Sequence, residues 1–152
     1  MSTFTKIHVA ISLIGILSGL MVMYGFLVGK RLRGWNALFL VMTIATSVTG
    51  FFFPFHGITP GIVVGVISLV VLALALLAWN KHWTKTYIIT ATVAEFFNVL
   101  VLIVQSFMKI PALHKLAPLG TEPITTVAKV GALVLFVVLG WVAVRRSAVM
   151  VG

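Results

Sequence analysis

Apolar runs of about 20 residues follow one another along almost the whole chain, and they constrain the fold more than any other feature. A helix of this length crosses the hydrocarbon core of a bilayer. Strands of a membrane barrel are about 10 residues long and alternate with polar residues, which these runs do not do. The sequence predicts an all-α bundle of five transmembrane helices in a single domain, residues 1–152. The predicted spans are residues 7–28, 35–55, 62–79, 86–108 and 124–144.

The composition agrees with a membrane protein and not with a soluble domain. Of the 152 residues, 61% are hydrophobic and 9% are charged, whereas soluble domains are nearer half apolar and a quarter charged. The net charge of +9 comes largely from residues at the ends of apolar runs, where they set topology and contact anionic lipid headgroups. We therefore expect a lipid bilayer as the partner, and no nucleic acid. The chain has no cysteine, which excludes thiolate metal sites and cysteine nucleophiles.

The distribution of basic residues predicts the orientation. One side of the predicted bundle carries Lys30, Arg31, Arg33, Lys81, Lys85, Arg145 and Arg146. The other side carries Lys6, Lys109 and Lys115. Because short cytoplasmic loops collect Lys and Arg, the N-terminus is predicted outside and the C-terminus in the cytoplasm. Tryptophans also gather at the cytoplasmic ends, as an aromatic belt does: Trp35, Trp79, Trp83 and Trp141.

Glu95 stands near the middle of the fourth run and is one of only two acidic residues in the chain. At 100° per residue, the polar residues of this run fall within an arc of about 140° on one helix face. An ionisable group at mid-membrane costs several kcal/mol unless it is paired, hydrated or neutralised, so it is a functional candidate by default. The predicted ligand or proton site on this face consists of Thr92, Glu95, Asn98, Gln105 and Ser106.

Three interpretations of Glu95 remain open at this point. The carboxyl is protonated and hydrogen-bonded across helices, or it lines a cavity for a proton-coupled or cationic solute, or it contacts a partner subunit. The candidate hydrogen-bond partners sit at similar depth in the second run: Thr43, Thr46 and Ser47.

A second group of polar residues is predicted at the outer end of the bundle. Histidines on neighbouring helices can ligate haem or a metal ion, can sense pH, or can simply occupy the membrane interface. Lys129 lies about 8 Å from the outer end of its span and Glu95 about 21 Å, so depth argues against a simple ion pair. We expect Lys129 to snorkel outward or to bond the polar stripe. The second candidate site is His8, His56, His114, Glu122 and Lys129.

The sequence carries no motif for a phosphate loop, a metalloprotease or a serine nucleophile, and it has no aspartate, so we expect no enzyme. The leading hypothesis is proton-linked transport or small-molecule binding at the polar site of the fourth helix, with no cofactor. A second hypothesis is an accessory or assembly subunit of a larger membrane complex. A third is an electron carrier that binds haem or a metal at the outer histidines.

Small residues four apart predict close helix contacts, either within the bundle or in a homo-oligomer. They occur at Gly15 and Gly19, at Gly25 and Gly29, and at Gly61 and Gly65.

The fourth run and the loop after it carry a pattern found in a group of bacterial proteins. The segments are Phe97-Asn98-Val99, Gln105-Ser106-Phe107, Lys109 to Leu113, Leu116-Ala117-Pro118 and Glu122-Pro123. This part of the chain resembles small uncharacterised bacterial polytopic inner-membrane proteins. The resemblance implies a multi-pass protein of the bacterial inner membrane.

Overall fold

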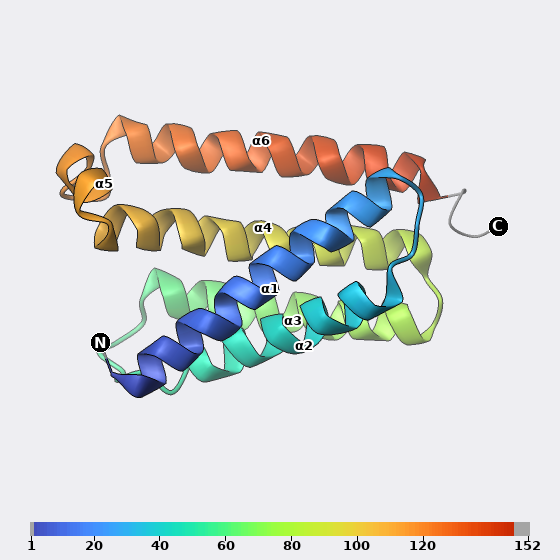
Figure 1. The fold of residues 1–152 in the computed structure, drawn as a ribbon, viewed down its shortest axis with the longest axis horizontal. Coiled ribbons are helices and arrows are strands. Elements are labelled where there is room, and N and C mark those ends of the chain that lie inside the picture. Colours follow the sequence, from blue (N-terminus) through green and yellow to red (C-terminus); the bar gives the residue numbers. More distant parts are fainter. Residues whose placement is uncertain (1, 148–152) are drawn as a thin grey trace.

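The computed structural model describes residues 2–147, and in these residues the chain forms six helices joined by short connections (Figure 1). The long helices coincide with the predicted apolar runs, and the all-helical prediction is confirmed. They are α1 (Thr3–Leu27), α2 (Arg33–Gly50), α3 (Pro60–Asn80), α4 (Thr84–Lys109) and α6 (Pro123–Arg145), and α5 (Pro111–Leu116) is short.

Four of these helices, α1, α3, α4 and α6, are long and apolar enough to cross a membrane. Helix α2 is not among them. It has 18 residues, and these include Arg33, Asn36 and four hydroxyl side chains that lower its apolar character. The structure thus gives a multi-pass helical membrane protein with four membrane-capable helices.

The long helices begin one to four residues before the predicted spans. Two larger differences from the prediction involve proline. The second run was predicted to continue to Phe55, but α2 ends at Gly50. Pro54 disfavours helical backbone in the residue before it, and the Phe53 ring instead packs 5.0 Å from the ring of His8. The segment after α4, predicted as a loop, contains α5. Pro111 occupies the first turn of α5, where its missing N–H and fixed φ suit a helix start.

Helix α4 is the centre of the bundle. It packs against α1, α3, α5 and α6, and side-chain hydrogen bonds connect it to α2 as well. Helix α1 runs diagonally over the others, from α2 at one end of the bundle to α4 and α6 at the other (Figure 1).

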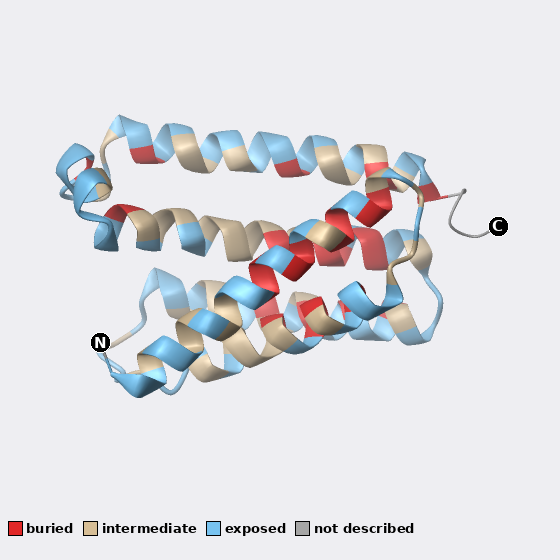
Figure 2. Cartoon of the chain, in the orientation of Figure 1, coloured by how far each residue is buried: buried red, intermediate tan, exposed pale blue. Residues whose placement is uncertain are grey.

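Many of the buried residues belong to α1 and α4, and Figure 2 shows them gathered around the crossing of these two helices. Small residues let α3 and α4 approach each other closely, since Ala75, Ala78, Ala91 and Ala94 are all at most 1% exposed. Large side chains of α1 and α2 fill the remaining space, among them Phe26 and Phe39. This crossing is also where the polar face of α4 is buried.

Candidate functional site

Glu95 lies in the fourth turn of α4, on the face that α1 crosses, and its side chain is 0% exposed. Its carboxyl group rests directly against the backbone of Gly19 on α1. A Cβ atom on Gly19 would overlap both carboxyl oxygens of Glu95. The Gly15-xxx-Gly19 pair therefore serves packing inside the bundle, and Gly19 provides the space that the carboxyl occupies.

The Asn98 amide connects Glu95 to α2. Asn98 lies one turn after Glu95 on the same face of α4, and its Nδ2 donates to Oε2 of Glu95 and to Oγ1 of Thr43, each at 3.2 Å. The other carboxyl oxygen, Oε1, is buried and has no hydrogen-bond partner within the described residues. The site thus contains three polar side chains from two helices and one free acceptor position.

The remaining residues of the predicted site do not reach the carboxyl group. Thr92 donates to the Ile88 carbonyl at 2.7 Å and contacts Met23 Sδ at 3.6 Å. Thr46 donates to the carbonyl of Met42 at 2.8 Å, one turn back in its own helix. Ser47 and Ser106 are partly buried and Gln105 is exposed, and no bond to Glu95 is found for any of these within residues 2–147.

A second buried polar contact was missed by the sequence analysis. Tyr87 Oη donates to Oδ1 of Asn36, and the two residues are 2% and 1% exposed. Asn36 Nδ2 donates in turn to the Leu32 carbonyl at 2.7 Å. The Tyr87 ring packs 5.0 Å from Trp79, and the Arg31 guanidinium lies 4.4 Å over that indole ring. An asparagine and a tyrosine inside apolar runs were the signal that could have indicated this contact.

The histidines of the second candidate site come from α1, from the α2–α3 connection and from α5. His8 Nδ1 lies 2.7 Å from Thr49 Oγ1 and its ring meets Phe53 edge-on. His56 and His114 are exposed and lie on separate segments. Within residues 2–147 there is no group of three or more side chains arranged to hold a metal ion.

Glu122 shapes the connection between α5 and α6. It stands at the N-cap of α6, and its Oε1 accepts the Leu119 backbone N–H at 2.8 Å. This hydrogen bond lowers the pKa of Glu122 below its usual range, because it stabilises the ionised form. The acid thus holds the turn that precedes α6.

Comparison of the chain with protein-family models, with curated proteins and with solved structures gives no match. The buried site supplies the chemical basis for a proposal about function. A carboxyl group in an apolar interior is stable only when it is protonated, paired or hydrated. The arrangement can hold a proton at Glu95 in one packing of the helices and release it when water or a cation gains access.

Proposed function

We propose that the chain is an integral membrane protein that couples the movement of a small solute to a proton, with Glu95 as the group that carries the proton. The observation behind the proposal is that the carboxyl is fully buried at the α1–α4 crossing while its Oε1 has no partner within the described residues. Ionisable groups inside a membrane bundle commonly mark proton relays or substrate pathways.

The contacts of Glu95 suggest how protonation and helix packing are linked. Protonated Glu95 fits against Gly19 and accepts from Asn98, so α1 and α4 stay in close contact. Loss of the proton to water leaves a carboxylate that requires water or a cation beside it. The crossing then opens at Gly19, where no side chain fills the space on the α1 side. Opening exposes the carboxyl and the Asn98 amide together, which gives a solute a polar contact inside the bundle.

We further propose that α2 also crosses the membrane, so that five helices span it with the N-terminus outside, in a bacterial inner membrane. At 1.5 Å per residue, α2 is about 27 Å long, close to the thickness of the hydrocarbon core. It packs against both α1 and α3 along the bundle. The Lys and Arg distribution favours the orientation, and the resemblance of the segment around α5 favours the location.

The topology has a direct test because the chain contains no cysteine. Single cysteines replacing Lys115 and Lys85 are placed at opposite ends of the bundle. A membrane-impermeant thiol reagent applied to intact cells should label Lys115→Cys and spare Lys85→Cys. Labelling of both residues from the outside, or the reverse pattern, would contradict the proposed orientation.

The transport role is tested by proton flux into liposomes that carry the purified full chain and a trapped pH-sensitive dye. A pH gradient with a potassium diffusion potential should drive a flux above that of protein-free liposomes. Glu95→Gln keeps the size of the side chain and removes its proton exchange, so the flux should fall to the protein-free level. Glu122→Gln is the matched control, because it removes the other acid of the chain and should leave the flux intact. Equal flux in wild type and Glu95→Gln would remove Glu95 from the mechanism.

The exposure of α6 favours a second candidate function, an accessory subunit in a larger membrane complex. In the most apolar 18-residue segment of α6 only 11% of the residues are buried, whereas 44% are buried in the corresponding segment of α1. A helix face of this kind can pack on another membrane protein as well as on lipid. Purification from native membranes in a mild detergent distinguishes the two: a stable complex of defined composition supports the accessory role, and an isolated chain with proton flux supports transport.

A further inference from the structure

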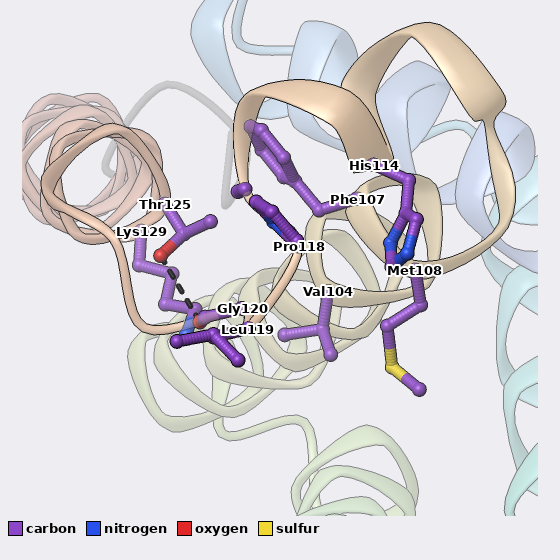
Figure 3. Close-up of a pocket in the computed structure, with 10 residues that line it drawn as sticks. Val104, Phe107, Met108, His114, Pro118, Leu119, Gly120, Thr125 and Lys129 are labelled. Carbon is purple, nitrogen blue, oxygen red and sulfur yellow. Dashed lines mark hydrogen bonds between the residues drawn. The ribbon is translucent and has the colours of Figure 1, made fainter.

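A pocket of about 310 Å³ opens at the end of the bundle where α4, α5 and α6 meet (Figure 3). Its walls come from three helices and from the connection between α5 and α6. Figure 3 shows Lys129 and Thr125 of α6 on one side of the pocket and His114 and Met108 on the other. Apolar side chains occupy the region between them, among them Val104, Phe107, Pro118 and Leu119.

The side chain of Lys129 is the part of this pocket that indicates an anionic ligand. It stands six residues after Pro123, or about 9 Å along α6 from the helix start, and it is partly buried. The chain has only two acids. Glu95 is enclosed at the α1–α4 crossing, and Glu122 already accepts the Leu119 N–H. Within residues 2–147 no hydrogen bond or ion pair of the Lys129 ammonium is found, and Lys129 lines a pocket whose other side chains are mostly apolar.

We propose that this α4–α6 pocket binds a phospholipid with an anionic headgroup, whose phosphate accepts hydrogen bonds from Lys129. An ammonium group donates charge-assisted hydrogen bonds to phosphate oxygens, and such bonds are shorter and stronger than those between neutral groups. The site is separate from Glu95, and the proposal does not depend on the transport function.

The surroundings of the pocket favour a membrane lipid over a soluble anion. Its volume is near the lower limit for ligand pockets, enough for a headgroup and the first carbons of the acyl chains. The chains then continue along α6, where Leu133 and Val137 follow Lys129 at four and eight residues on the same side of the helix and are 47% and 62% exposed. A cation above an exposed apolar stripe matches the two parts of an anionic lipid.

The test uses native mass spectrometry of the full chain released from detergent, with phosphatidylglycerol or phosphatidylcholine added at known concentration. We expect one phosphatidylglycerol bound per chain more tightly than phosphatidylcholine. Lys129→Gln should weaken this binding about tenfold or more, since a charge-assisted hydrogen bond is lost. Lys129→Arg retains the charge and should retain most of the binding, which shows that an effect of the Gln variant is not a folding defect.

Lys115→Gln is the matched control. Lys115 belongs to α5 at the same end of the bundle, but it does not line the pocket. Equal weakening by Lys115→Gln and Lys129→Gln would overturn the proposal, because the binding would then reflect net charge alone. Displacement of the lipid by millimolar inorganic phosphate would also overturn it, by showing that a free anion is sufficient. Preference for a fatty acid such as decanoate over phosphatidylglycerol would have the same consequence.

Discussion

Replacement of Gly19 by alanine should destabilise the bundle, because a Cβ at this position overlaps the Glu95 carboxyl. The carboxyl must then leave its place beside α1 and lose its bond to Asn98. Overpacking costs about 1–3 kcal/mol, the lost bond about 0.5–1.5 kcal/mol, and the better helix propensity of alanine returns up to about 1 kcal/mol. We expect a net loss of about 1–3 kcal/mol in the free energy of unfolding.

The same substitution should behave differently once the carboxyl is gone. In a Glu95→Ala background the overlap is absent, so Gly19→Ala should be neutral or stabilise by up to about 1 kcal/mol. The double-mutant cycle should therefore give a coupling energy of about 1–4 kcal/mol between the two positions. Gly131→Ala on α6 is the control for helix propensity alone, because a Cβ there meets nothing within 4 Å.

Unfolding of the full chain in mixed micelles of a mild detergent and dodecyl sulfate, followed by circular dichroism, supplies these free energies. Equal costs of Gly19→Ala in the two backgrounds, to within the scatter of about 0.5 kcal/mol for independent sites, would refute a coupling between Gly19 and Glu95. An equal effect of Gly19→Ala and Gly131→Ala would refute it as well, because the close contact of Gly19 with Glu95 would then have no energetic effect.

Two further substitutions test the remaining polar contacts. Tyr87→Phe leaves the buried Asn36 carbonyl without its donor and should cost about 1–3 kcal/mol in thermal unfolding; an unchanged melting temperature would contradict the contact. The carboxyl of Glu122 should titrate below the value of about 4.3 of a free glutamate, because the Leu119 N–H stabilises its ionised form. The stability that this bond contributes is present above that value and is lost as the pH falls through the lowered pKa, and Glu122→Gln should lack the step when the stability is measured against pH.

Most of the fold could be predicted from the sequence because few backbone conformations are stable inside a bilayer. Apolar runs of about 20 residues form helices in lipid, since every backbone polar group must be satisfied internally. The incorrect predictions concern the segments between the apolar runs, where contact with lipid does not determine the backbone conformation. Phe51 to Phe55 are apolar enough to continue α2, but Pro54 and the packing of Phe53 on α1 end it. Pro111 starts α5 in a segment whose prolines had suggested only a loop.

The candidate site could be predicted on α4 but not across helices. Helical periodicity places Asn98 on the same face as Glu95, and the structure gives the bond between them. Periodicity within one helix says nothing about the crossing of α1 over α4, so the contact with Gly19 could not be foreseen. For the same reason the sequence could not choose Thr43 over Thr46, which instead bonds its own helix.

The packing of α1 on α2 has a consequence for the order of assembly during synthesis. These two helices leave the ribosome before α4, because they precede it in the chain. Helical segments insert individually before they associate, and the α1–α2 hairpin holds Gly15 against Thr43. Gly19 and the Thr43 hydroxyl are then already in place when α4 inserts. The surface of α1 and α2 that contacts Glu95 and Asn98 thus forms before α4 inserts. Burial of the carboxyl is then a late step in the assembly of the bundle.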